Sequence, residues 1–222
     1  MGSLIIPKLI LEGRYDSITR KIANDIFYIV KETKGNDNVI EAELPSDLNG
    51  EESYQHESGI DLTAAIYVAR MERLYYGGEY KDFYVKSYID ENDELVLEIT
   101  LDIDKEPQSY EELFYKINED VRHEIEHYTQ AVMLSKPHSD KPTAQMDSTY
   151  EHHMEPSEVA ALVHGFYRRA KLEKKPIDIV MLDDLNNDIK LGNLTQEEAD
   201  KLFHTWINYS RRRLPQAIYS NK

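Results

Sequence analysis

The sequence predicts an α+β fold in which a small mixed or antiparallel β-sheet packs on one long helix and a mostly helical C-terminal half follows. Alternation of apolar and polar residues between positions 60 and 103 is typical of half-buried strands. Apolar residues at helical spacing occupy 109–134 and recur after residue 156. A chain of 222 residues suits one domain with a sizeable core, so we expect a single domain over 1–222.

The composition disfavours several classes of protein. A hydrophobic fraction of 41% and 16 tyrosines argue against a largely disordered chain. No apolar run approaches the roughly 20 residues that cross a bilayer. We therefore expect no membrane partner. Pro7-Lys8 interrupts the first apolar run, so we also expect no signal peptide. The expected location is the cytoplasm, or the host cytoplasm if the protein is viral. A net charge of −16 disfavours nucleic acid as a partner.

The chain contains no cysteine. Disulfide bonds, thiolate metal sites and a cysteine nucleophile are therefore excluded. Any bound metal must be held by histidine and carboxylate side chains, of which the chain has 8 and 42.

The first 135 residues are predicted to contain a helix within 1–38, and then the sheet and a long helix within 39–135. Apolar residues at helical spacing predict the first helix from about Tyr15 to Ile29. A hairpin-turn composition at 90–93 predicts that the strands on either side of it pair with each other. The alanines of the second expected strand leave a helix open as an alternative there. Four strands are expected, at 39–44, 60–68, 83–89 and 94–103.

The long helix is predicted from Ser109 to Leu134. Ser109 and Glu112 form a capping box at its start, and Pro137 follows its end. An irregular loop is expected over 135–149. The apolar stripe of the helix consists of Leu113, Ile117, Val121, Ile125, Tyr128 and Val132.

Further helices are predicted in the C-terminal part, 150–222. Pro156 suits the first position of a helix that extends to about Lys171. A second helix is expected over 177–190. The capping box formed by Thr195 and Glu198 predicts the start of a last helix, which ends near Arg213.

The long helix carries the pattern His-Glu-x-x-His at His123, Glu124 and His127. Residues four apart lie on the same helix face, so both imidazoles can reach one metal ion. Glu124 lies beside the first histidine, where it can polarise a metal-bound water without binding the metal itself. This is the arrangement of a zinc site of the metallopeptidase type.

A catalytic zinc site usually has three protein ligands and one open position. The extended pattern HExxHxxGxxH is absent, because Gln130 occupies its glycine position and Met133 its last histidine position. A glutamate on the following helix is the other source of a third ligand. The candidates are Glu151, His152, His153, Glu155 and Glu158.

We favour Glu158 because Ala161 and Gly165 lie on the same helix face, and small residues there allow the helix to approach the histidines closely. Glu155, one turn earlier, is the second choice. His152 or His153 is the third choice, since adjacent histidines in a loop are more often solvated. His164 lies on a different face, where hydrogen bonding near the site or simple exposure is expected.

The segments 127–130 and 156–161 match the pattern HExxHxxQ followed by a Pro-x-Glu-(Ile/Val)-x-Ala helix. In these features the chain resembles the zincin metallopeptidases that use a glutamate ligand. It is most similar to small HExxH peptidases of bacteria and tailed bacteriophages. The matched region extends from about 95 to 171, roughly a third of the chain.

The resemblance implies a zincin-like fold and a Zn²⁺ ion held by His123, His127 and Glu158, with Glu124 as general base. It also implies that the strand 94–103 forms the sheet edge over the cleft, where a peptide or protein substrate would add as a further strand. Such enzymes often stabilise the oxyanion with a tyrosine or histidine, and Tyr150 and Tyr167 are the nearest candidates.

The predicted function is therefore zinc-dependent hydrolysis of peptide bonds. A second hypothesis is a non-catalytic structural or interaction protein, associated with a phage, that retains a zinc site. A third is a zinc hydrolase acting on a non-peptide amide, such as a deformylating enzyme. The absence of a cysteine ligand argues against the common version of that enzyme.

Overall fold

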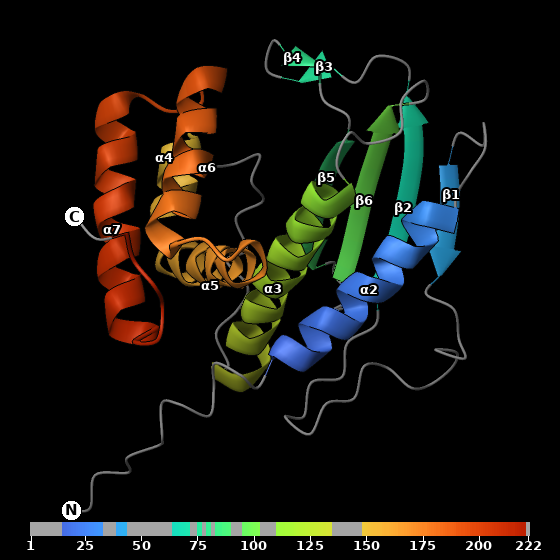
Figure 1. Cartoon of the computed structure of the whole chain (residues 1–222), viewed down its shortest axis with the longest axis horizontal. Helices are drawn as coiled ribbons and strands as arrows, with labels where there is room; N and C mark the ends of the chain where they lie inside the picture. Colours follow the sequence, from blue (N-terminus) through green and yellow to red (C-terminus); the bar gives the residue numbers. More distant parts are fainter. Residues whose placement is uncertain are drawn as a thin grey trace, which may run out of the picture.

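The computed structural model describes residues 15–32, 39–43, 64–71, 75–76, 79–80, 83–89, 95–102, 110–134 and 148–220. Within these residues the fold is mixed, with helices and a small sheet, as the α+β prediction requires (Figure 1). The predicted capping box at Ser109 and the predicted loop at 135–147 lie outside the described residues. None of the described helices is long and apolar enough to cross a membrane.

The main sheet has four strands, and a separate two-stranded sheet joins β3 (Tyr75–Tyr76) and β4 (Glu79–Tyr80). The two outer pairs of the main sheet are antiparallel, whereas its two inner strands are parallel. The predicted pairing across 90–93 is confirmed, since Phe83 lies opposite Leu101 and Ile89 opposite Leu95. The strand order is β1 (Val39–Glu43), β2 (Ala64–Met71), β6 (Leu95–Asp102) and β5 (Phe83–Ile89).

The position of β6 corrects one expectation. The strand 94–103 was expected at the sheet edge, but β6 pairs with β2 on one side and with β5 on the other. A strand that is hydrogen-bonded on both sides has no backbone groups left for a peptide. The edge beside the long helix is β5, which contacts that helix directly.

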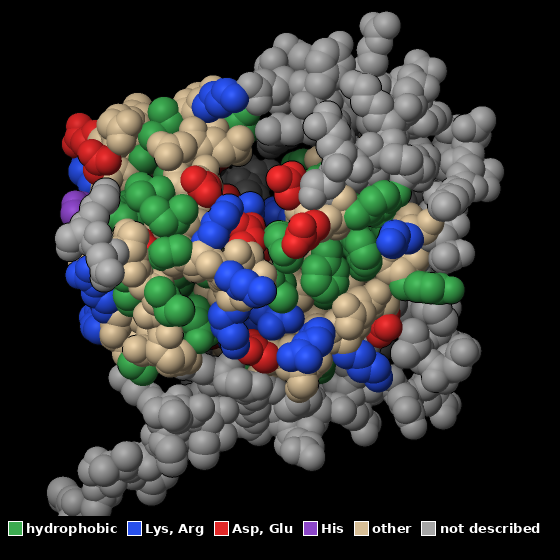
Figure 2. Space-filling model, viewed as in Figure 1, with side chains coloured by type: hydrophobic (Ala, Val, Ile, Leu, Met, Phe, Trp, Pro, Cys, Tyr) green, Lys and Arg blue, Asp and Glu red, His purple; other side chains and the backbone are tan. Residues whose placement is uncertain are grey.

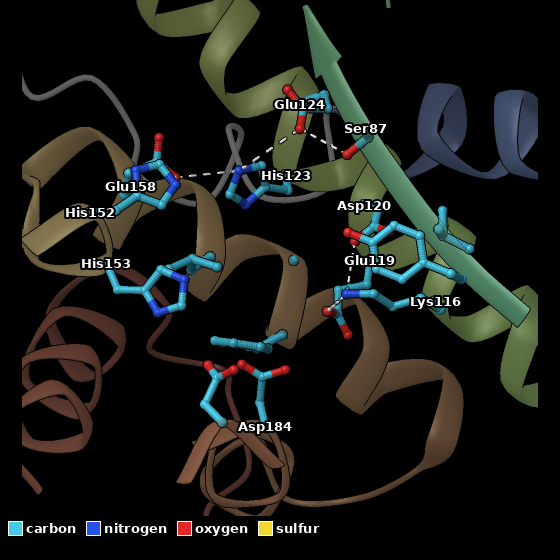
Figure 3. A pocket seen from close by; sticks show the side chains of 16 residues that line it. Ser87, Lys116, Glu119, Asp120, His123, Glu124, His152, His153, Glu158 and Asp184 are labelled. Carbon is cyan, nitrogen blue, oxygen red and sulfur yellow. Dashed lines mark hydrogen bonds and ion pairs between the residues drawn. The ribbon is translucent and has the colours of Figure 1, made fainter. Parts of the chain in front are cut away.

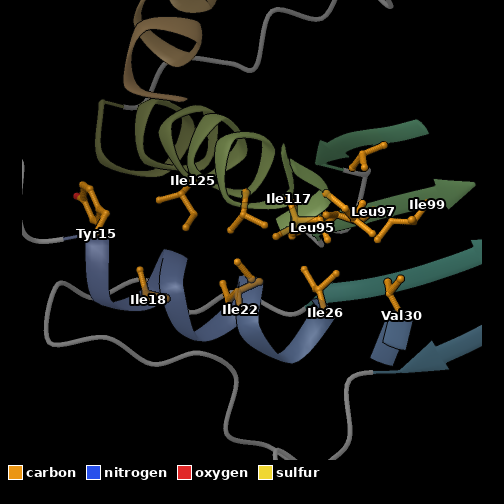
Figure 4. Close-up of a cluster of buried hydrophobic side chains, with 14 of the residues drawn as sticks. Tyr15, Ile18, Ile22, Ile26, Val30, Leu95, Leu97, Ile99, Ile117 and Ile125 are labelled. Atoms are coloured by element: carbon orange, nitrogen blue, oxygen red, sulfur yellow. The ribbon is translucent and has the colours of Figure 1, made fainter. Parts of the chain in front are cut away.

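The first hydrophobic core lies between the sheet and two helices, α2 (Asp16–Glu32) and α3 (Tyr110–Leu134). Both helices bury the apolar residues that their spacing predicts, except Ile29 and Val132, whose side chains lie outside the described part of the chain. Figure 4 shows the buried side chains meeting those of β6. The inward-facing residues of β6 are at most 1% exposed. The core residues contributed by α3 are Leu113, Ile117, Val121, Ile125 and Tyr128.

The second core contains no strand of the described sheets and lies among helices. It joins α5 (Pro156–Glu173), α6 (Ile177–Leu191) and α7 (Gln196–Arg213) around Trp206, which is fully buried. The predicted capping box of α7 is confirmed, because the Thr195 side chain accepts from the Glu198 backbone and the Glu198 side chain accepts in return.

A short helix, α4 (Thr149–Met154), replaces the loop expected around the adjacent histidines. The Ser148 hydroxyl accepts a hydrogen bond from the Glu151 backbone N–H and so caps this helix. Ser148 and Glu151 have capping-box spacing, a signal that is present in the sequence. His152 and His153 are therefore held on a helix beside the second core.

Candidate metal centre

The two histidines of the HExxH pattern lie on one face of α3 with their rings 4.6 Å apart. Their Nε2 atoms are 2.9 Å apart. His127 is 9% exposed and His123 is half-buried, so both rings are largely removed from water. The one-turn spacing predicted from the sequence therefore does bring both nitrogens to a common point.

Glu158 approaches this point from the first turn of α5. Its Oε1 is 3.1 Å from His127 Nε2, and its Oε2 is 3.5 Å from His123 Nε2. The ligand atoms of the three residues lie within 4.8 Å of one another. Two ligands on a tetrahedral ion with bonds of about 2.0–2.1 Å would be roughly 3.4 Å apart. The three separations lie close to that value, so these side chains can hold a metal ion.

The close approach of α5 to α3 depends on the small residues that the sequence analysis singled out. Ala161 is fully buried. A Cβ atom placed on Gly165 would lie 3.1 Å from the Glu119 carbonyl oxygen and 3.7 Å from His123 Cβ. Glycine at this position therefore lets the backbone of α5 lie directly against α3, on the helix face that carries His123.

Farther along this interface, Arg168 donates from Nε and Nη2 to Asn118 Oδ1. Arg168 is 4% exposed and Asn118 is fully buried. A buried hydrogen bond to a charged group contributes more to stability than a neutral one. This pair fixes how the two helices lie against each other.

The other candidates for the third ligand lie outside this group. Among the described residues, His123, His127 and Glu158 are the set whose ligand atoms come together. Glu155 is the N-cap of α5 and its side chain makes no cap hydrogen bond, while Glu151 is exposed. His152 is the nearest of the four, since its Nε2 lies 3.6 Å from Glu158 Oε2.

Glu124, the predicted general base, is 4% exposed. Its Oε1 accepts a hydrogen bond of 2.8 Å from Ser87 Oγ on β5 and lies 3.9 Å from His123 Nε2. Burial raises the pKa of Glu124 to about 7, although nearby His127 and the Ser87 hydrogen bond act in the opposite direction. Ser87 was not singled out from the sequence, because strand alternation alone does not show which helix residue a serine will meet.

The ionisation of the three ligand candidates is set by their mutual contacts. Burial, together with the neighbouring His127, lowers the pKa of His123 to about 3. Burial opposes ionisation of Glu158, but the hydrogen bond and charge of His127 outweigh it and hold the pKa of Glu158 near 2. Burial lowers the pKa of His127, but the hydrogen bond and charge of Glu158 outweigh burial and raise it overall. A neutral imidazole and an ionised carboxylate are the forms that bind metals, so metal binding would displace a proton from His127.

A buried network lies behind the ligand helix. Arg122 Nη2 donates to Glu126 Oε2 at 3.1 Å and lies 3.0 Å from His164 Nδ1. Burial and the charge of Arg122 lower the pKa of His164 to about 4. His164 therefore joins α5 to α3 by hydrogen bonding. Hydrogen bonding near the site was one of the two roles expected for it, the other being simple exposure.

A cavity of about 340 Å³ adjoins the three ligand candidates. Figure 2 shows the surface hollowed between the two halves of the molecule, with acidic and basic side chains around the hollow. Figure 3 shows its interior, where the side chains of α3, α4, α5 and α6 converge. The cavity also takes in residues that sequence reasoning missed, because they belong to separate elements: Tyr84, Ser87, Lys116, Asp120, Asp184 and Asp188.

Tyr150 and Tyr167 pack against the second core, and neither lines this cavity. Tyr167 lies nine residues after Glu158 on α5, which places it on the opposite helix face. Among the described residues that line the cavity, His152 and Tyr84 carry groups that can donate a hydrogen bond to an oxyanion. The role expected for Tyr150 and Tyr167 stays a prediction.

Comparisons with protein-family models, with curated proteins and with solved structures find no match for this chain. The functional assignment therefore depends on the side chains themselves.

Proposed function

We propose that this chain is a zinc-dependent metallopeptidase of the zincin-like, glutamate-ligand kind. The observation that carries the proposal is the convergence of His123, His127 and Glu158 beside an acidic group, Glu124, at one end of a cavity. Two imidazoles and one carboxylate are a ligand set of catalytic zinc sites that leave one position open. Imidazole ligands also suit copper, iron and nickel, so the metal itself must be measured.

A zinc ion in such a site supplies an acidified water molecule and polarises a carbonyl group. The side chains of the protein contribute by positioning the reacting groups and by transferring protons. Glu124 takes a proton from the attacking water and delivers it to the leaving amine. Ser87 holds Glu124 Oε1 at 2.8 Å, which fixes the orientation of the carboxylate.

The substrate that best fits this arrangement is an extended peptide along β5. This strand pairs with β6 on one side, and Ser87 connects it to Glu124. A peptide that adds to the other side would be held by main-chain hydrogen bonds. It would then pass close to the general base.

A second candidate function is a structural metal site without catalysis. His152 Nε2 lies 3.6 Å from Glu158 Oε2, and a small movement would make it a fourth ligand. Four protein ligands close a zinc site and are typical of structural zinc. In that case His152→Ala should weaken zinc binding about as strongly as loss of His127, and X-ray absorption should show no water among the ligands.

The test combines metal analysis with one isosteric substitution. Protein purified without added zinc should contain one zinc per chain and should cleave unfolded casein. Glu124→Gln should retain the zinc and lose about 10²–10⁴-fold in rate, the usual contribution of general acid–base catalysis. Glu112→Gln, an exposed change in the first turn of the same helix, is the matched control. Parental activity in Glu124→Gln would refute the mechanism.

A further inference from the structure

The cavity has a second end that the catalytic residues do not use. Its first end is formed by His123, Glu124 and Glu158. Asp184 and Asp188 of α6 also line it, and Figure 3 shows Asp184 on the side away from Glu124. A ligand held at the metal centre can therefore extend a side chain toward two carboxylates of another helix.

The two basic side chains in this region, Lys116 and Arg169, form ion pairs with other acidic residues. Lys116 Nζ lies 2.7 Å from Glu119 Oε1 and 2.9 Å from Asp120 Oδ1. Arg169 Nη1 pairs with Glu119 Oε2 at 3.2 Å and its Nε pairs with Glu173. No described cation lies within ion-pair distance of Asp184 or Asp188. The α6 end of the cavity therefore has excess negative charge.

One carboxylate oxygen in the cavity wall has no donor among the described residues. Oδ2 of Asp120 is buried and has no hydrogen-bond partner among the described residues. A buried carboxylate oxygen without a partner is costly, and native structures rarely leave one without a function. Asp120 therefore adds to the acidic character of the cavity wall.

The state of Asp184 agrees with this charge balance. Burial raises its pKa to about 7, and the neighbouring Glu119 adds to the effect, while Lys116 opposes it. Asp188 accepts a hydrogen bond from the Asn193 side chain at 3.0 Å. Asp184 thus lies beside like charges, and its ionised form would be stabilised by an incoming cation.

The cavity wall also contains apolar side chains among its polar ones. Val85, Leu162 and Phe166 contribute them. Its volume of about 340 Å³ is near the lower limit for ligand pockets. A lysine or arginine side chain can place its aliphatic stem against these apolar side chains while its cation reaches the carboxylates of α6.

We propose that this cavity selects substrates with a basic side chain next to the scissile bond, and that Asp184, assisted by Asp188, determines this specificity. The inference rests on the proposed peptidase function. The net charge of −16 acts in the same direction, because it attracts basic peptides to the molecule.

The experiment measures binding without turnover. Zinc-loaded Glu124→Gln protein is titrated with two pentapeptides, Ala-Ala-Lys-Ala-Ala and the same peptide with norleucine in place of lysine. Norleucine keeps the aliphatic stem and removes the ammonium group. The lysine peptide should bind about tenfold or more tightly, as expected for one charge-assisted hydrogen bond in a partly buried site.

The same titration is repeated in two variants of α6. Asp184→Asn should reduce the preference for lysine to less than about threefold. Asp183→Asn is the matched control, because Asp183 is the adjacent residue on the same helix and its side chain is 57% exposed. It should leave the preference unchanged. Thermal unfolding of both variants establishes that they are folded.

Each outcome decides the proposal. Equal binding of the two peptides, or binding of neither, overturns it, as does a lysine preference that survives Asp184→Asn. A lysine preference that depends on Asp184 supports it even if the parental protein cleaves nothing, and in that case only the peptidase function fails. Cleavage of casein at sites without lysine or arginine nearby would support the peptidase function and refute the pocket.

Discussion

Replacement of Glu158 by glutamine tests which residue completes the metal centre. The structure shows three ligand atoms within 4.8 Å, and Glu158→Gln weakens one of the three while preserving the shape of the side chain. Loss of a residue that merely supports a zinc ligand costs about 10–100-fold in affinity. Direct removal of the charged ligand should therefore cost about 100-fold or more, which is roughly 2.7 kcal/mol.

This loss should appear as reduced stabilisation by zinc. At free zinc a thousand times the parental dissociation constant, binding adds about 4.1 kcal/mol to the free energy of unfolding. A 100-fold weaker site gains only about 1.4 kcal/mol under the same conditions. For a chain of this size the difference of about 2.7 kcal/mol corresponds to a fall of roughly 5–11 °C in the zinc-dependent rise in Tm.

The assay measures Tm with and without zinc for each protein, so that every variant is compared with its own metal-free form. Zinc affinity is measured separately by competition with a coloured chelator. Glu155→Gln is the control, because Glu155 precedes the same helix and its side chain makes no cap hydrogen bond. A parental zinc response in Glu158→Gln, with its loss in Glu155→Gln, would show that the packing argument chose the wrong glutamate.

Two further predictions concern packing and pH. Gly165→Val should lower the free energy of unfolding, measured in urea, by about 1–3 kcal/mol, the usual cost of overpacking. The reason is that a Cβ atom added there would lie only 3.1 Å from the Glu119 carbonyl oxygen. Unchanged stability and zinc affinity would contradict the close contact between α5 and α3. Asp184 has a folded-state pKa of about 7, above its unfolded value near 3.8. A raised carboxyl pKa destabilises the fold above pH 7, and this effect disappears as the pH falls toward 4. Asp184→Asn should therefore be more stable than the parent at pH 8 and should lose this advantage near pH 4, which urea unfolding at both values would measure.

The sequence predicted those parts of the site that depend on local spacing. His123 and His127 lie one helical turn apart, so their convergence requires only that 110–134 be a helix. Glu158 required one further step, namely that small residues mark the face on which two helices meet. Ala161 and Gly165 carried that information, and the structure places them in the contact.

The order of strands could not be obtained in this way. Alternation shows that 83–89 and 94–103 pair with each other, but it does not show which of them receives a third strand. The parallel pairing of β2 with β6 made β5 the edge. For the same reason Ser87, Lys116 and Asp184 were missed, since they meet only through contacts between elements distant in sequence. The start of α4, by contrast, could have been predicted, because Ser148 and Glu151 have capping-box spacing. The adjacent histidines were instead interpreted as part of a loop.

The three candidate ligands come from helices that pack in different cores, and this arrangement has a consequence for the biosynthesis of the protein. His123 and His127 belong to the helix that covers the sheet, whereas Glu158 belongs to the helical half. During synthesis the histidines leave the ribosome first, and domain parts fold largely in the order in which they emerge. A nascent chain therefore presents only two ligands until α5 has docked on α3. On the proposed function, metal capture and hydrolysis would both be delayed until the two halves are folded.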